Sequence, residues 1–434
     1  MTRLKEYNGH YCESEYEYAF IGFLEAEGWI YSSGNNISRV TKRDVLIADD
    51  FKNFISDTNS DLTEDEVTQI FDNVRLVGSE SDFATLHKVY GWMVDGVQFT
   101  PQDGLARMIP LIDFENPDKN IFRVVNQFAV EYTNNGQKEN RRPDVLLFVN
   151  GMPLCVIELK NPADANATIY DAWEQINIRY WRDIPHLLHY CPLACISDGV
   201  KTRLGTVRTP YEHFYAWRRV NDGDTVSTLP FEETETMIKG VYAPERFLEI
   251  FRDYIYFQDS IYDSDEVEIV CRYPQFFAAR LLKQSIINSV VQKSGKGGTY
   301  FGATGCGKTY TMAFLARQLA LRCTDIPEIG SPTIILIVDR DELQKQGAKL
   351  FTKSMEFLNL GEVSVVKNRA QLRQELGARQ SGGFYICTIQ KFCDREDDKI
   401  GLINDRQNII CFSDEAHRTQ LEHSKKIQFS KDAD

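Results

Sequence analysis

The first half of the chain alternates between stretches with apolar residues at helical spacing and short, continuous apolar runs. Residues 13–28 (ESEYEYAFIGFLEAEG) and 61–75 (DLTEDEVTQIFDNVR) have the helical pattern, which predicts two amphipathic helices. In the second, Thr63 stands in the N-cap position with Glu66 three residues on, the pair that forms a capping box. Strand-like runs follow at 122–132, 145–149, 154–160 and 193–199, and a helical stretch lies at 169–182. This order predicts an α/β core of roughly 200 residues.

The second half has the pattern of a parallel sheet. Residues 220–240 are polar and rich in turn formers, so a domain boundary is expected between 220 and 265. Short apolar runs then occur at 299–301, 333–339, 363–367, 384–389 and 408–412, with helical stretches up to residue 323 and through Leu350. Such runs are typical of strands buried on both faces, as in parallel sheets with helices on either side. We therefore expect two α/β domains, residues 1–250 and 251–434.

One stretch, RRPDVLLFVNGMPLCVIELKNP at 141–162, predicts a buried hairpin that turns at the Asn-Gly pair 150–151. A two-residue loop would place Asp144 opposite Ile157. A three-residue loop, 150–152, would place Asp144 opposite Glu158. We expect the three-residue loop.

The expected loop has two consequences for the hairpin. It leaves Pro153 inside a strand, which requires a sheet edge or a bulge at that point. Because side chains alternate along a strand, it also puts Asp144, Glu158 and Lys160 on one face and turns Leu159 toward the core. Two carboxylates would then lie roughly 5 Å apart at the end of a buried ribbon.

Charges at the end of a buried strand cost several kcal/mol unless they are paired or bound to an ion. Two carboxylates and a lysine that converge there are typical of a metal-dependent phosphodiesterase. Asp144 and Glu158 would hold Mg²⁺, whose charge offsets their mutual repulsion and lowers the pKa of a bound water. Lys160 would position that water or neutralise developing charge. The alternative is a surface salt bridge between Glu158 and Lys160.

A nucleotide site is indicated by GATGCGKT, Gly302 to Thr309, which fits G-x-x-x-x-G-K-[ST] in full. Glycines let backbone N–H groups surround phosphate oxygens, and the N-terminus of the following helix adds a favourable dipole. Lys308 would reach the β- and γ-phosphates, and the Thr309 hydroxyl would bind Mg²⁺. The candidate ATP-binding residues of the loop are Gly302, Thr304, Gly305, Cys306, Gly307, Lys308 and Thr309.

A second part of the nucleotide site follows the last apolar run. Asp414 could hold the Mg²⁺ and Glu415 could orient the attacking water. These residues begin the sequence DEAH, so this half resembles the first motor lobe of superfamily 2 helicases and translocases. The resemblance implies that Gln275, in RYPQ, reads the adenine edge. It also implies contacts with the DNA backbone from loops after strands, and the candidates are Arg340, Thr388, Gln390 and Lys391.

The first half matches the nuclease pattern P-D…[DE]-x-K, with thirteen residues between Asp144 and Glu158. In nucleases of this fold a third acid projects from the first helix, and Glu15 and Glu17 are both candidates. The 169–182 helix resembles a Q-x-x-x-Y element found in part of the family. Here Gln175 and Tyr180 are one residue farther apart than in that element, and an α-helix does not place residues i and i+5 on one face.

A PD-(D/E)xK nuclease followed by a DEAH motor resembles the restriction (motor) subunit of type I restriction–modification enzymes. The resemblance spans roughly residues 10 to 425 and rests on the combination of motifs. It implies ATP-driven translocation of double-stranded DNA and cleavage of unmodified DNA away from the recognition site. It implies ATP and Mg²⁺ as cofactors, and specificity and methyltransferase subunits as partners.

Two other interpretations stay open. One is another nuclease–motor fusion, such as a type III restriction subunit or a stand-alone helicase–nuclease, in which the nuclease usually follows the motor. The other is a non-catalytic remnant that binds DNA or ATP. The intact Asp144, Glu158, Lys160 and Lys308 argue against the remnant.

Composition is consistent with a soluble globular protein, with 43% hydrophobic and 26% charged residues. No apolar stretch approaches the roughly 18 residues of a membrane span, and the first residues lack the apolar region of a secretory signal. We therefore expect a cytoplasmic protein without membrane contact, and reduced, packed cysteines. The net charge of −14 argues against coating nucleic acid, although the basic run KENRR (138–142) lies beside Asp144.

The chain ends at Asp434, shortly after the DEAH segment. Motors of this kind need a second lobe to supply an arginine to the γ-phosphate. We therefore expect an N-terminal fragment that binds ATP weakly and shows no DNA-stimulated ATP hydrolysis. Phosphate release, measured with and without double-stranded DNA, tests this, and robust DNA-dependent turnover by these residues would refute it.

Overall fold

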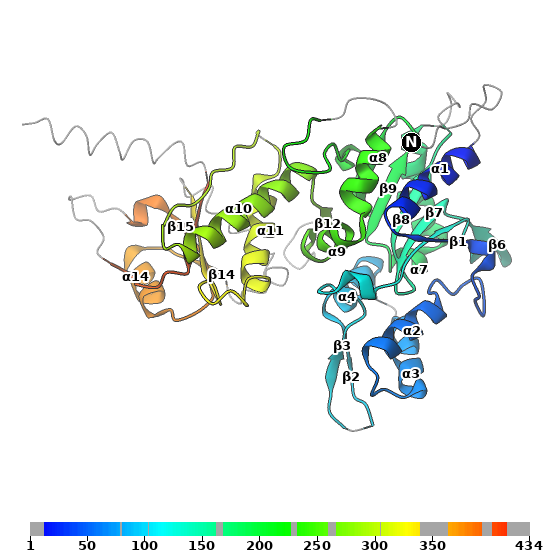
Figure 1. The fold of residues 1–434 in the computed structure, drawn as a ribbon, viewed down its shortest axis with the longest axis horizontal. Coiled ribbons are helices and arrows are strands. Elements are labelled where there is room, and N and C mark those ends of the chain that lie inside the picture. The colour runs from blue at the N-terminus through cyan, green and yellow to red at the C-terminus, as the bar shows by residue number, and fades with distance from the viewer. Residues whose placement is uncertain are drawn as a thin grey trace, which may run out of the picture. The chain divides into compact units, whose positions relative to one another are not determined.

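The computed structural model describes residues 13–78, 80–102, 104–161, 168–226, 232–258, 266–303, 305–338, 363–392 and 402–414. The chain divides into two compact units (Figure 1), one formed by 1–257 with 265–273 and the other by 258–264 with 274–434. The expected boundary at residue 250 falls inside helix α9 (Pro244–Asp253). Along the sequence, the chain passes from the first unit to the second between Phe257 and Pro274.

The first unit is built on a six-stranded mixed sheet with strand order β1-β4-β7-β8-β9-β10. Its strands are β1 (Ile30–Ser33), β4 (Phe122–Asn126), β7 (Val145–Val149), β8 (Met152–Leu159), β9 (Leu193–Ser197) and β10 (Thr202–Thr206). β1 and β4 are parallel, as are β8 and β9, and the other neighbours are antiparallel. Strands β7 and β8 are buried at every position, so both faces of this ribbon are covered.

Helices and smaller ribbons complete the first unit. The helices are α1 (Glu13–Ala26), α2 (Ala48–Thr58), α3 (Glu64–Arg75), α4 (Asp82–Asp95), α5 (Ile169–Glu174), α6 (Trp181–Asp183), α7 (Pro185–Leu188), α8 (Glu232–Met237) and α9, with π-helices η3 (Gln175–Tyr180) and η5 (Ile238–Tyr242). Short 3-10 turns are η1 (Gly34–Asn36), η2 (Pro117–Lys119) and η4 (Tyr211–His213). The ribbons are β2 (Val97–Phe99) with β3 (Arg107–Ile109), β5 (Val130–Asn134) with β6 (Gln137–Arg141), and β11 (Ile255–Gln258) with β12 (Val267–Val270).

The predicted elements of this half are largely confirmed. Thr63 and Glu66 form the expected capping box at the start of α3. The turn-rich prediction for 220–240 is wrong from residue 232 onward, where α8 and η5 are helical. The helix forms because Met237 and Tyr242 are buried, and because Gly240 has no Cβ to overlap the Trp217 ring beside it.

The hairpin differs from the expected one in its turn. Val149 pairs with Met152, so the loop has two residues, and Asn150 and Gly151 have φ values of 50° and 77°. Positive φ at both central residues is the type I′ geometry that Asn-Gly favours. The expected three-residue loop is therefore wrong.

A β-bulge nevertheless produces the expected pairing. The register shifts between Leu147 and Phe148, so that Val145 lies opposite Ile157. Asp144 is thereby level with Glu158, and its backbone N–H donates to Glu158 Oε1 at 3.4 Å. The bulge adjoins Pro153, which cannot donate a ladder hydrogen bond and so favours an irregularity there.

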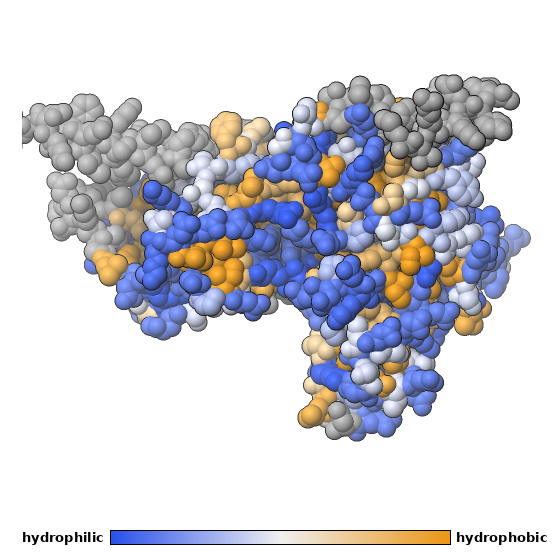
Figure 2. Space-filling view, viewed as in Figure 1, coloured by the Kyte–Doolittle hydropathy of each residue, from blue (hydrophilic) through white to orange (hydrophobic). Residues whose placement is uncertain are grey.

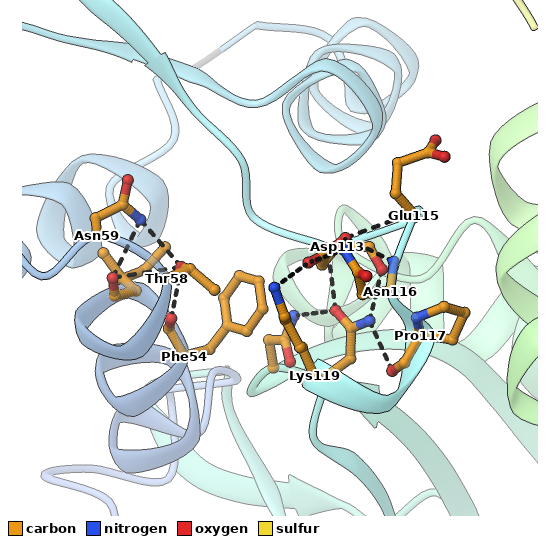
Figure 3. A network of polar contacts seen from close by, with 11 residues as sticks. Phe54, Thr58, Asn59, Asp113, Glu115, Asn116, Pro117 and Lys119 are labelled. Atoms are coloured by element: carbon orange, nitrogen blue, oxygen red, sulfur yellow. Dashed lines mark hydrogen bonds and ion pairs between the residues drawn. The ribbon is translucent and has the colours of Figure 1, made fainter.

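The turn of the β7–β8 ribbon is fixed by a buried polar network. The Asn150 side chain donates to the Leu111 carbonyl at 2.9 Å and to Asn120 Oδ1 at 2.8 Å, and accepts from the Ile121 N–H at 2.8 Å. Figure 3 shows the neighbouring loop folded around Asp113, with which the Asn120 side chain exchanges hydrogen bonds. Because Asn150 is fully buried, these bonds replace the water that its amide would otherwise require.

The second unit contains a four-stranded parallel sheet with strand order β14-β15-β13-β16. The elements are β13 (Thr333–Val338), β14 (Val363–Val365), β15 (Phe384–Thr388) and β16 (Ile409–Ser413), with helices α10 (Tyr273–Val291), α11 (Lys308–Leu321), α14 (Arg369–Ala378) and the 3-10 turn η6 (Ile389–Phe392). The predicted parallel sheet is confirmed. Residues 299–301 do not form the expected strand, and Phe301 is 96% exposed. The helix expected through Leu350 lies outside the described residues.

The polarity of the surface and the free state of the described cysteines are those that the composition predicts. The viewed face is mostly hydrophilic (Figure 2). Exposed apolar side chains include Met108 in β3 and Leu105, which precedes that strand. Within the described ranges, no helix has the length and apolar character to cross a membrane. The described cysteines are free thiols, and most of them are buried, as expected.

We predict that Gly151→Ala destabilises the protein more than Gly136→Ala does. Both glycines have positive φ, 77° and 80°, so alanine is strained at either position. At Gly151 a Cβ would also overlap the Ile47 carbonyl oxygen, whereas nothing lies within 4 Å at Gly136. Urea unfolding should show an additional loss of about 1–3 kcal/mol for Gly151→Ala. Equal losses for the two variants would contradict this packing.

Candidate functional site

Three charged side chains lie together at the start of β7 and the end of β8, the two central strands of the six-stranded sheet. They are Asp144, Glu158 and Lys160. Asp144 precedes β7, Glu158 is the penultimate residue of β8, and Lys160 follows that strand. The Leu159 N–H donates to Asp144 Oδ2 at 2.8 Å, and the Lys160 N–H donates to the Ser197 carbonyl at 2.8 Å. Backbone hydrogen bonds therefore fix the end of β8 against both Asp144 and β9.

Glu158 is a fully buried carboxylate, and the described residues provide hydrogen-bond partners for only one of its two oxygens. Its Oε1 accepts from the Tyr180 hydroxyl at 2.6 Å, and its Oε2 has no hydrogen-bond partner among the described residues. Burial raises the pKa of Glu158 well above its usual value, and the nearby Asp144 carboxylate raises this pKa further, against a smaller lowering by Lys160. A positive charge near Oε2 would satisfy this carboxylate.

Lys160 is tied to Glu158 through a chain of side chains on η3. The Lys160 ammonium donates to Gln175 Oε1 at 2.9 Å, Gln175 Nε2 donates to the Tyr180 hydroxyl at 2.8 Å, and Tyr180 donates to Glu158. The alternative of a surface salt bridge is not what the described structure contains, since Glu158 is buried and the Lys160 ammonium bonds to Gln175.

The longer Gln175–Tyr180 spacing is matched by the local backbone. Residues 175–180 are π-helical, with i→i+5 hydrogen bonding, and this geometry brings residues five apart onto one face. The expectation that an α-helix would separate the two side chains is wrong because the helix is not α-helical here. The extra residue in the spacing was the signal for a π-helix, and our sequence analysis missed it.

Of the two candidates for a third acid, Glu17 is buried at 5% exposure and Glu15 is exposed. Glu17 Oε1 accepts from Asn126 Nδ2 at 2.6 Å, and Oε2 accepts from Gln127 Nε2 at 2.8 Å. Asn126 is the last residue of β4 and pairs with the first residue of β7, next to Asp144. The Glu17 carboxylate therefore faces the sheet edge that carries Asp144.

Within the described ranges, no group of three or more His, Cys, Asp and Glu side chains is placed to hold a metal ion. The basic run at 138–142 is partly neutralised, since Lys138 pairs with Glu131 at 3.0 Å and Arg141 Nε with Asp183 at 2.7 Å. The carboxylates at the sheet edge are thus Asp144 and Glu158, with Glu17 held nearby by amides.

In the second unit, residues 302–303 and 305–307 form a glycine-dependent stretch directly before α11. Gly305 and Gly307 have φ values of 79° and 81°, which favour glycine, and the Cβ side of Gly305 is open. A Cβ at Gly302 would lie 2.7 Å from Cys306 Sγ. The Lys308 ammonium donates to the Gly302 carbonyl at 3.1 Å and so lies across the loop. Thr309 is the second residue of α11.

Gln275 is buried against this loop. Its Nε2 donates to the carbonyls of Cys306 and Gly307 at 3.3 and 3.1 Å, so α10 contacts the backbone of the glycine loop through this side chain. A Cβ at Gly307 would overlap this amide, which is a second reason for glycine there. The resemblance implies that Gln275 reads the adenine edge, but it gives no indication of the contact between Gln275 and the loop.

The remaining candidates follow the strands of the parallel sheet. Asp414 comes directly after β16, and its N–H donates to the Ile337 carbonyl at 2.9 Å. Thr388 ends β15 and is buried, whereas Gln390 and Lys391 lie in η6, where the Lys391 ammonium donates to the Val366 carbonyl at 2.5 Å. Thr304, Arg340 and Glu415 lie outside the described residues.

Comparisons with known proteins find two families along the chain. The family described as type I restriction enzyme R protein N terminus matches residues 11–213. The family described as SWI2/SNF2 ATPase matches residues 274–430. The first match contains every residue at the carboxylate site, and the second begins one residue before Gln275 and contains the glycine loop.

Curated relatives match nearly the whole chain. The type I restriction enzyme HindI endonuclease subunit of Haemophilus influenzae is 30% identical over 96% of this chain and 40% of its own length. The putative type I restriction enzyme MjaIXP endonuclease subunit of Methanocaldococcus jannaschii is 29% identical over 93% of this chain and 39% of its own length. A Staphylococcus aureus subunit, SauCOLORF180P, is 24% identical over 90% of this chain and 40% of its own length. The chain thus spans about 40% of the length of these relatives.

We predict that Glu158→Gln stabilises the protein at neutral pH when divalent cations are removed. The folded-state pKa of Glu158 is raised, so the unfolded chain releases this proton near pH 4.3, roughly its usual pKa, while the folded chain keeps it. Wild-type stability therefore falls as pH rises from that value toward the folded pKa, and the glutamine variant lacks this loss.

Urea unfolding in EDTA between about pH 5 and pH 8 measures the effect, which should exceed about 1 kcal/mol at the upper end. Glu25→Gln, at an exposed position of α1, is the control and should unfold like wild type at each pH. A Glu158→Gln variant that is less stable than wild type at every pH tested would show that the ionised carboxylate does not lower the stability of the fold.

Proposed function

We propose, since this chain belongs to the family of type I restriction enzyme endonuclease (R) subunits, that it carries the DNA-cutting and DNA-translocating sites of such a subunit. In this proposal, ATP hydrolysis drives movement along double-stranded DNA, and unmodified DNA is cleaved away from the recognition site. The observation that carries the cutting function is the pairing of Asp144 with Glu158, whose buried Oε2 has no partner among the described residues.

The first unit is proposed to be a PD-(D/E)xK nuclease domain. Asp144 and Glu158 would hold Mg²⁺. Glu158 Oε2, which has no partner among the described residues, fits such an ion because the ion would supply the positive charge that the buried carboxylate lacks. When bound, the ion lowers the pKa of a water and offsets charge on the phosphate. The chain's own residues do the rest: Tyr180 orients Glu158, and Gln175 holds the Lys160 ammonium on the same side.

Lys160 is proposed to position the attacking water or to neutralise charge that develops on the phosphate. Its ammonium is held by a neutral amide oxygen, 2.9 Å away, rather than by a carboxylate. A neutral partner leaves the full positive charge of the lysine for the substrate. The π-helix is therefore proposed to serve the reaction by placing Gln175 and Tyr180 together.

The second unit is proposed to be the first RecA-like motor lobe. The Lys308 ammonium and the loop N–H groups would bind the phosphates, and Thr309 and Asp414 would hold Mg²⁺. Glu415 would orient the attacking water. Gln275 stays the candidate for adenine recognition, and its buried bonds to two loop carbonyls would link that recognition to the loop.

The partners follow from the same family assignment. We propose that the chain works on double-stranded DNA, with specificity and methyltransferase subunits, in the cytoplasm. Contacts with the DNA backbone are proposed for Arg340, Thr388, Gln390 and Lys391, because Thr388 ends β15, Gln390 and Lys391 follow that strand in η6, and Arg340 is expected to follow a strand. Phosphate contact needs only hydrogen-bond donors and positive charge, which these side chains provide.

The proposal predicts that two lysine variants separate the two activities in the assembled enzyme. Lys160→Ala should lower DNA cleavage by at least about a hundredfold and leave ATP hydrolysis intact, because only the nuclease site is changed. Lys308→Ala should stop both, because cleavage depends on translocation. The assay follows supercoiled plasmid cutting and phosphate release with the partner subunits present.

Lys239→Ala is the matched control, since this exposed lysine pairs with Glu235 on the α8–η5 segment and should affect neither activity. Full cleavage by Lys160→Ala would overturn the nuclease assignment. Full ATP hydrolysis by Lys308→Ala would overturn the motor assignment separately.

A further inference from the structure

One residue with a strained backbone connects Asp144 to the first helix, α1. Gln127 follows β4 and has a φ of 51°, a left-handed conformation that non-glycine residues adopt at a cost. Such strain persists only where the surroundings fix it, and it concentrates at functional sites. Two contacts surround it here: the Gln127 N–H donates to the Asp144 carbonyl at 3.1 Å, and its side-chain Nε2 donates to Glu17 Oε2 at 2.8 Å.

The backbone path of this residue is shaped by Gly34, which directly follows β1 and begins the turn η1. A Cβ on Gly34 would lie 2.6 Å from the Asn126 carbonyl oxygen, 2.7 Å from Phe128 Cα and 2.8 Å from the Gln127 carbonyl oxygen. No Cβ fits at these separations, so the turn at 126–128 can pass this close to position 34 only if that residue is glycine. The strained turn is therefore a built feature of the fold.

Glu17 is held by two amides whose orientations are set. Tyr31 donates to Asn126 Oδ1 at 3.1 Å, which leaves Asn126 Nδ2 to donate to Glu17 Oε1 at 2.6 Å. Each carboxylate oxygen accepts a single amide hydrogen bond and keeps a further acceptor position, as ligating and water-binding carboxylates commonly do.

We propose that Gln127 is a positioning residue that locks Glu17 to Asp144, and that Glu17 so held binds a water of the cation's hydration shell. The inference rests on the proposed nuclease function and names the third acid of that site. Glu17 acts through water because no three-carboxylate cluster exists in the described structure, and because Mg²⁺ keeps several waters when two carboxylates bind it.

The test is calorimetric titration of Mn²⁺ into the 434-residue chain. The heat that Asp144→Asn removes reports the nuclease site and excludes binding elsewhere. Gln127→Gly keeps the backbone path, since glycine accepts a positive φ, and deletes the side chain together with the amide that bonds to Glu17. We expect Gln127→Gly to weaken the Asp144-dependent binding by about tenfold or more, as loss of a residue that orients a ligand does.

Two further variants separate positioning from general damage. Glu17→Gln should weaken Mn²⁺ binding, and Glu17→Gln with Gln127→Gly should be no weaker than Glu17→Gln, because Gln127 acts through Glu17. Asn135→Gly is the matched control: Asn135 has a φ of 48° in the exposed β5–β6 turn, and its replacement should leave Mn²⁺ affinity unchanged.

The outcomes divide cleanly. Normal Mn²⁺ affinity in Gln127→Gly or in Glu17→Gln, with binding lost in Asp144→Asn, overturns this inference and leaves the nuclease assignment standing. Additive losses in the double variant also overturn it, because Gln127 would then act independently of Glu17. Absence of any Asp144-dependent binding in the wild-type chain overturns both the inference and the metal site on which it rests.

Discussion

The first unit depends on one electrostatic constraint, a carboxylate that is sealed from water and only half satisfied. Glu158 is fully buried, and within the described residues its Oε1 accepts from the Tyr180 hydroxyl and, at a longer distance, from the Asp144 N–H, while its Oε2 has no partner. Neutral hydrogen bonds to one oxygen do not replace the hydration of an ionised carboxylate, so burial favours either the neutral acid or a positive counter-charge. A protein stabilised only by packing would gain from a nonpolar side chain at this position. The cost is explained if a cation occupies the site during function.

The departures from regular geometry gather around this carboxylate. The β-bulge between β7 and β8 brings Asp144 level with Glu158, and the π-helix η3 brings Tyr180 and Gln175 together. The left-handed Gln127 connects Asp144 to the first helix. Bulges, π-helical turns and strained residues each cost stability, and they are typically kept where they aim a side chain at a functional site.

The sequence predicted features that depend on residues near one another in the chain better than features that depend on distant residues. The capping box at Thr63 and the parallel strands of the second unit were predicted because they depend on local pattern. The convergence of Asp144 and Glu158 was predicted with the wrong turn, because the bulge beside Pro153 adds the residue that we had assigned to the loop.

Other features could not be predicted from local pattern. The helical character of 232–242 depends on packing against Trp217, which lies outside that segment. The choice of Glu17 over Glu15 depends on amides from β4, more than a hundred residues along the chain. Positive φ at Gln127 has no signal in its own residue type, because the backbone there passes Gly34, which directly follows strand β1.

The most direct test of this account is the location of a divalent cation in crystals of the protein grown with Mn²⁺. Anomalous scattering should give a peak at the sheet edge, bound by carboxylate oxygens of Asp144 and Glu158, with Glu158 Oε2 among them. No peak there, with Glu158 Oε2 bonded to a protein group or still without a partner at saturating Mn²⁺, would contradict the account.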